Sequence, residues 1–316
     1  MSIDRISTSA QTAFFLSQIQ NAGNALDKVQ EQIASGKNAN TYAGFGDKAQ
    51  ILTATIAATS RNTAYTNATK FAVTQTDLQD TQLTSLSSLA TTLKKAVSDA
   101  VANNDATTLM TQAQSIFEQA SAILNSKDAN GDYIYSGGKT DVPPVTVGSL
   151  AALQALPAVS GAFANGNLNK SVQVADGVTV DYSLTASNVG TDLMQVLKDI
   201  ATFDVGGSGN FNAATSLSAA QNTFLTNTIS QTATASTNLN AATAANGYVS
   251  NRLTDAQTQQ ASMSTLYKGF VSDVQDTNMA EAATRLSLNQ TQLQAALQVT
   301  AGLHQLSLLN YLPIQG

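Results

Sequence analysis

The two ends of the chain carry almost no charge, although both have the residue pattern of amphipathic helices. No Asp, Glu, Lys or Arg occurs from Ile6 to Leu26 or from Leu286 to Gly316. A helix on a protein surface normally carries charged residues on the face that meets water. We therefore expect both ends to be covered by protein, first by each other and then by further copies of the chain.

Apolar residues near the N-terminus recur at alternating steps of four and three, which is the spacing of a coiled-coil seam. The predicted seam consists of Phe15, Ile19, Ala22, Leu26, Val29 and Ile33. Near the C-terminus the steps are seven and four, and the stripe comprises Leu286, Leu293, Leu297, Ala301 and Leu308, broadened by Leu303 and Leu306. The polar residues between them are mostly amides and hydroxyls, which avoid the desolvation cost of Lys or Glu.

The composition of the whole chain favours an assembling protein over a monomeric enzyme. Charged residues make up 11% of the 316 residues, against about 25% in an average globular protein. The net charge of −6 with a pI near 4.6 argues against nucleic acid and anionic membranes as partners. Since the chain has no cysteine, disulfides, thiolate catalysis and thiolate metal sites are excluded.

Neither a membrane span nor a secretory signal is expected. No run of about 18 apolar residues occurs, as a transmembrane helix would require. The segment from Met1 to Ala13 is polar and has no continuous apolar region of the kind found in signal peptides. If the protein leaves the cell, another route must carry it.

Long helices are predicted in both arms of the chain. The N-terminal arm should contain helices over Ile3–Ser35, Lys48–Asn103 and Ala106–Leu124, with Gly36 as a C-cap and Thr41–Asp47 as a loop. After the middle of the chain we expect a helix over Asp192–Thr202 with Thr191 as N-cap, and a long helical stretch over Ala213–Val274 interrupted near Gly247.

The middle of the chain has a different pattern. Helix breakers crowd the segment Asp141–Leu156, which contains Pro143, Pro144 and Gly148. Apolar and polar residues then alternate on both sides of Asp176-Gly177, a pair that suits a type I′ turn, so a β-hairpin is predicted. A loop with accidental alternation is the alternative.

The expected fold is therefore mainly α. The N- and C-terminal arms form a long coiled-coil or helical-bundle rod, and a small β-rich insert lies at its far end. We expect three domains: a terminal coiled coil (1–40 with 275–316), a helical rod (41–140 with 191–274) and a small β insert (141–190).

Four short segments resemble those of the flagellin family of bacterial flagella, and within it the branch of hook–filament junction proteins. They are Ser35-Gly36-Lys37, the stretch Asp128–Thr140, the stretch Asp276–Ala282, in which Asn278 stands where an acid is common, and the ending Leu306–Leu312. The resemblance covers both helical arms and leaves the β insert unmatched. It implies a subunit exported through the flagellar type III channel, with its terminal helices in an inner tube and its insert facing solvent.

The same resemblance implies the partners. These are other copies of the chain, hook-associated protein 1, flagellin and an export chaperone, on the extracellular bacterial flagellum. The residues expected to carry the assembly seam are Phe15, Ile19, Leu26, Val29, Ile33, Leu286, Leu293, Leu297, Leu303 and Leu308.

No catalytic, cofactor or metal site is predicted. The single histidine, His304, cannot build a multi-histidine site and is interpreted as a packed or hydrogen-bonding helix residue. The stretch Gly206–Gly209 lacks the strand and lysine of a phosphate-binding loop, and is interpreted as a flexible loop. Asp273, Asp276 and Glu281 lack the glycine of a calcium loop and are expected near a helix N-terminus.

A structural junction subunit is thus the favoured function. A filament flagellin is one alternative, and a binding module or adhesin that uses the β insert is another. The apolar stripes could also belong to an ordinary bundle within a monomer.

Overall fold

The computed structural model describes residues 3–309, with side chains placed for residue 10 and residues 12–302. The chain forms two compact units, residues 62–263 and the two terminal segments 1–61 and 264–316, and each is described by itself. Seven α-helices, three short 3-10 helices and one two-stranded sheet make up the described residues. None of the helices in this part of the chain is both long enough and apolar enough to cross a bilayer.

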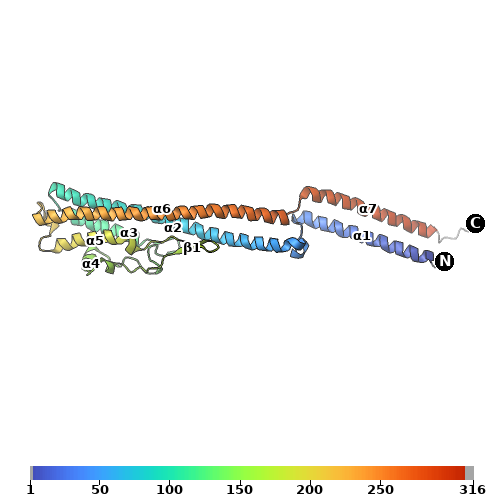
Figure 1. Cartoon of the computed structure of the whole chain (residues 1–316), viewed down its shortest axis with the longest axis horizontal. Coiled ribbons are helices and arrows are strands. Elements are labelled where there is room, and N and C mark those ends of the chain that lie inside the picture. The colour runs from blue at the N-terminus through green and yellow to red at the C-terminus, as the bar shows by residue number, and fades with distance from the viewer. Residues whose placement is uncertain (1–2, 310–316) are drawn as a thin grey trace, which may run out of the picture. The chain divides into compact units, whose positions relative to one another are not determined.

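The predicted mainly α fold is confirmed (Figure 1). Helix α1 spans Ile3–Ser35 as predicted, and the residue after it, Gly36, has a positive φ of 69° that suits a C-cap. A 3-10 helix, η1 (Tyr42–Lys48), replaces the predicted loop over Thr41–Asp47.

Helix α2 spans Ala49–Asn103 and ends in a Schellman motif. Asn104 adopts a left-handed conformation with φ of 55°, and its amide donates to Val101. The amide of Asp105 donates to the carbonyl of Ala100. The predicted break at Asn104 therefore has a specific cause, because Asn tolerates this conformation better than most residues. Helix α3 (Leu109–Leu124) begins three residues later than predicted.

The core of the unit 62–263 lies where α2 and α6 (Ala219–Gln275) meet α3 and α5 (Ala186–Val205). The amide of Asn246 on α6 donates to the Thr76 carbonyl on α2 at 2.8 Å, so the two long helices lie side by side within this unit. The stacked rings of Phe203 and Phe224, with centroids 4.1 Å apart, pack against this core.

Two helix predictions in this unit were wrong. Helix α5 begins at Ala186, not Asp192, and its N-cap is Thr185, whose hydroxyl accepts from the Asn188 amide. Thr191 therefore lies inside the helix. Helix α6 runs through Gly247 without a break. A helical glycine costs about 1 kcal/mol relative to alanine, and the packing of neighbouring side chains such as buried Leu253 outweighs it.

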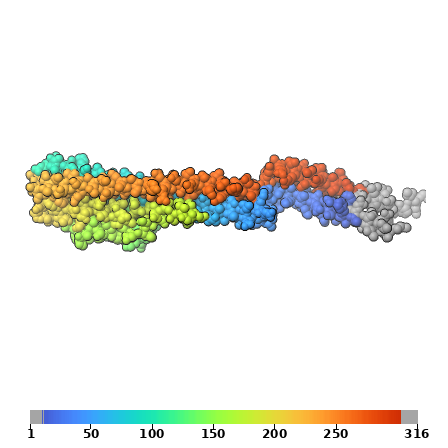
Figure 2. Space-filling model, viewed as in Figure 1, coloured from blue at the N-terminus to red at the C-terminus, as the bar shows by residue number. Residues whose placement is uncertain are grey.

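The proline-rich segment contains short helices that the sequence pattern did not predict. They are α4 (Leu150–Gln154), capped by the Ser149 hydroxyl at 3.1 Å from the Ala152 amide, and the 3-10 helix η2 (Val159–Ala162). Figure 2 shows this part of the chain, in green, as a bulge beside the long helices of its unit. The other 3-10 helix, η3 (Phe211–Ala213), precedes α6.

The predicted β-hairpin is confirmed, with strands β1 (Ser171–Ala175) and β2 (Val178–Asp181). Its turn differs from the predicted type I′, because only Gly177 of the two turn residues has a positive φ. The pairing is also irregular between Gln173 and Ala175.

One face of the hairpin is buried against the long helices. Val172, Val174 and Val180 pack with Ala72 of α2 and Leu253 of α6. The buried amide of Gln260 joins the elements, since its Nε2 donates to the Val174 carbonyl at 2.8 Å and to the Thr69 hydroxyl at 2.9 Å. One face of the hairpin is thus covered by α2 and α6, and the other face is exposed. The resemblance implied an insert that faces solvent.

Candidate assembly interface

The unit of the two chain ends is built around a pair of antiparallel helices. Helix α1 packs along α7 (Met279–Leu309), and the bridge between Lys37 and Asp276 joins the C-terminal end of α1 to the start of α7. Figure 2 shows the two helices, blue and red, in contact along the part drawn in colour.

The predicted N-terminal seam residues lie on the side of α1 that is least exposed. Val29 is buried, and the other four are partly buried, namely Phe15, Ile19, Leu26 and Ile33. Their spacing explains this, because alternating steps of four and three keep one side of a helix toward a single partner.

On α7 the least exposed residues agree only in part with the predicted seam. The least exposed residues follow steps of four and three: Ala282, Leu286, Asn289, Leu293, Ala296 and Thr300. Leu286 and Leu293 therefore lie on this side, whereas Leu297 is 50% exposed. Leu303 and Leu308, together with His304, lie outside the residues whose side chains are described.

A second apolar stripe on α7 points away from this seam. Leu288 and Val299 are 56% and 49% exposed, and the small residue Ala295, also exposed, lies between them. Leu288 and Val299 are eleven residues apart, which is about three helical turns, so they share one face. On α1 the large apolar side chains of Phe14 and Leu16 are 59% and 52% exposed. This stripe was not predicted, although its steps of seven and four are visible in the sequence.

Charge is divided unequally between the two units. The terminal segments 1–61 and 264–316 contain seven basic and seven acidic residues, whereas 62–263 contains eight basic and fourteen acidic residues. The whole formal charge of −6 thus lies in the second unit. Copies of the neutral unit can approach one another without the net repulsion that a charged unit would produce.

The polar groups at the start of α7 are arranged as in an ordinary helix N-terminus. The Asn278 side-chain oxygen accepts from the amides of Ala280 and Glu281 at 3.1 and 3.3 Å. Glu281 lies in the first turn, where a negative charge is favoured, and pairs with Arg285. Among the described residues, no three His, Cys, Asp or Glu side chains are grouped so that they could hold a metal ion.

Parts of the chain are similar in sequence to known flagellar proteins. The model of the bacterial flagellin C-terminal helical region matches residues 229–312. Flagellar hook-associated protein 3 of Salmonella typhimurium is 27% identical over 144 residues, which are 44% of this chain and 45% of that protein. The chain thus matches less than half the length of this curated relative.

Two solved structures share the fold. One is a protein from Vibrio parahaemolyticus assigned as a flagellar hook-associated protein, with a TM-score of 0.60 and 19% identity over 72% of this chain and 97% of that chain. The other is FlgL from Bacillus cereus, with a TM-score of 0.51 and 14% identity over 70% of this chain and 98% of that chain. The resemblance to flagellins of the hook-associated branch, predicted from short motifs, is confirmed.

Proposed function

We propose that this protein is a structural subunit of the bacterial flagellum that joins hook-associated proteins to the flagellin filament. The observation that carries the proposal is the helix pair of α1 and α7, which has no charged residue over Ile6–Leu26 and after Arg285 and keeps one apolar stripe exposed. The C-terminal region of the chain also matches the flagellin model. A helix pair that buries one stripe internally and leaves another exposed is suited to packing against neighbouring subunits.

The physical driving force is burial of apolar side chains without desolvation of charge. Leu288, Val299, Phe14 and Leu16 would each contribute about 1–2 kcal/mol when a neighbouring subunit covers them. Because α7 has no charged side chain after Arg285, no ion needs to be dehydrated in the contact. The proposed assembly surface also includes the predicted seam residues Leu297, Leu303 and Leu308.

In this function each of the three predicted domains would have a separate place in the assembly. Segments 1–40 and 275–316 would form an inner tube, segments 41–140 and 191–274 the surrounding rod, and 141–190 a small insert. The partners would be further copies, hook-associated protein 1 and flagellin, with an export chaperone and the type III channel delivering the subunit.

The test is incorporation of stripe variants into flagella. We expect Leu288→Asp and Val299→Asp to reduce the amount of the protein in sheared flagella at least about tenfold, since each places a charge in an apolar contact. The side chains are exposed in the single chain, so folding should be unaffected. Leu168→Asp is the matched control, because Leu168 is 67% exposed but lies in the other unit. Normal incorporation of both stripe variants would contradict the proposal.

Immunogold labelling of the wild-type protein separates the junction from the filament. Label confined to the boundary between hook and filament supports a junction subunit. Label along the whole filament would identify a filament flagellin instead.

A further inference from the structure

The break between α6 and α7 occurs where the sequence has no helix breaker. Gln275 ends α6 and Met279 begins α7, and the three residues between them are Asp276, Thr277 and Asn278. Neither glycine nor proline is present, although these are the residues that usually interrupt a helix. Asn278 caps the start of α7 from within this segment, but the contacts that hold the end of α6 come from outside it.

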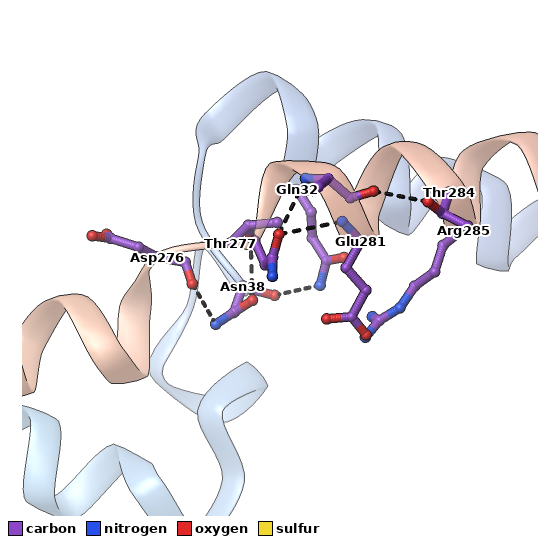
Figure 3. Close-up of polar contacts among 9 residues, drawn as sticks. Gln32, Asn38, Asp276, Thr277, Glu281, Thr284 and Arg285 are labelled. Atoms are coloured by element: carbon purple, nitrogen blue, oxygen red, sulfur yellow. Dashed lines mark hydrogen bonds and ion pairs between the residues drawn. The ribbon is translucent and has the colours of Figure 1, made fainter.

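Asn38, which follows α1, donates to three carbonyl groups at the end of α6 and directly after it. Figure 3 shows its contacts with Asp276, Thr277 and Gln32. Its backbone amide donates to the Gln275 carbonyl at 2.7 Å. Its side-chain Nδ2 donates to the carbonyls of Val274 and Asp276 at 3.1 and 2.9 Å. One residue from the N-terminal arm thus caps the end of a helix more than 230 positions away.

The capping is reciprocal. The Thr277 amide donates to the carbonyl of Gly36, the residue after α1, at 2.9 Å. The Thr277 hydroxyl donates to Asn38 Oδ1 at 3.2 Å, and Gln32 Nε2 of α1 donates to the Asn38 carbonyl at 2.8 Å. The end of α1 and the end of α6 therefore satisfy each other's backbone groups.

These contacts compete directly with helix continuation. In an unbroken helix the carbonyls of Val274, Gln275 and Asp276 would accept from the amides four residues later, those of Asn278, Met279 and Ala280. Asn38 donates to all three of these carbonyls instead. The Ala280 amide, which would have bonded to Asp276, is bound instead by the Asn278 side chain.

We propose that the α6–α7 break is conditional on Asn38, and that α6 continues into α7 as one helix when the 36–40 segment is not docked. Asp, Thr and Asn are only modestly unfavourable inside a helix, so the junction can adopt either state. Docking of the N-terminal arm then sets the direction of α7.

The test uses the full chain carrying Asn38→Ala, with backbone 13Cα shifts of residues 276–278 as the readout. We expect these shifts to be non-helical in the wild type and to become helical in the variant. Hydrogen exchange at Ala280 and Glu281 should slow by about tenfold, because their amides pass from a helix N-terminus to a helix interior. Asn38→Asp keeps the shape but replaces the donor by a charge that a helix C-terminus disfavours, so it should shift the junction further.

The matched control is Asn40→Ala. Asn40 lies in the same segment, but its side chain donates to Glu31 and not to α6. Its removal should leave the junction shifts unchanged. Non-helical shifts at 276–278 in Asn38→Ala would overturn the proposal, because the break would then be encoded locally. Random-coil shifts throughout α7 would also overturn it. Asn38 would then be needed for α7 to fold, and not for the break between α6 and α7.

Discussion

At the scale of single residues, Tyr135 has a buried hydroxyl without a hydrogen-bond partner among the described residues. Its side chain is fully buried in the core of the unit 62–263. Burial raises the pKa of the Tyr135 phenol well above its usual value near 10, because the charged form would lose its hydration. The folded state therefore keeps this proton at a pH at which the unfolded state releases it.

This difference predicts a loss of stability in alkali. Above about pH 10 the unfolded chain binds fewer protons than the folded chain, so the free energy of unfolding should fall by about 1.4 kcal/mol per pH unit for this phenol. Tyr135→Phe should remove that contribution and, by removing an unpaired hydroxyl, should stabilise the protein by about 1 kcal/mol at neutral pH. Urea unfolding between pH 7 and 11 measures both effects.

A second phenol in the same unit contributes in the same direction. Burial, and then the negative charge of Asp128, raise the pKa of Tyr182. Tyr135→Phe should therefore reduce the alkaline loss of stability without abolishing it. The same alkaline loss in the variant and the wild type would contradict the assignment to Tyr135.

At the scale of elements, apolar spacing predicted the existence of the long helices but not their tertiary exceptions. The steps of four and three placed α1 correctly because one partner covers one side of it. They did not place the start of α5, where Gly190 lies inside the helix and faces Leu124 and Phe163. The need for a glycine there arises from contacts between segments far apart in the sequence, which local patterns do not encode.

The candidate interface was predictable to the same extent. The sequence marks the apolar positions of α7, but which of them face α1 depends on the phase of packing, and Leu288 and Leu297 are exposed as a result. The capping of α6 by Asn38 could not be predicted, because it joins backbone groups through a turn whose docking is a tertiary event.

Two of the helical glycines, Gly190 and Gly247, predict opposite effects of the same substitution. A Cβ at position 190 would lie 2.7 Å from Leu124 Cδ1 and 3.3 Å from Phe163 Cε1, whereas nothing lies within 4 Å of one at position 247. Gly190→Ala should destabilise the unit by about 1–3 kcal/mol through overpacking. Gly247→Ala should stabilise it by about 0.5–1 kcal/mol, because alanine is the better helix former.

Thermal unfolding of both variants provides the measurement. Since the two changes are chemically identical and both lie in helices of one unit, helix propensity alone would raise both midpoints. A raised midpoint for Gly190→Ala would show that the surrounding core relaxes without cost, contrary to the close contact with Leu124.

At the scale of the whole molecule, the separation of charge predicts how assembly responds to salt. The unit of the two chain ends has no net charge, and its exposed stripe has no ionic groups, so assembly through it is driven by apolar burial. Simple salts screen charge, whereas sulfate strengthens apolar burial through exclusion from the surface. The two kinds of salt should therefore act differently on co-assembly with the flagellar partners.

We expect the concentration needed for co-assembly to change by less than about threefold when NaCl rises from about 50 to 500 mM, and to fall in sulfate of equal ionic strength. Sedimentation of the purified proteins measures both responses. The variant Leu288→Asp gives the internal comparison, because a charge placed in the stripe should make any residual assembly sensitive to NaCl. A wild-type assembly weakened tenfold by NaCl would instead assign the contact to the acidic unit, where attraction to a basic partner would be screened.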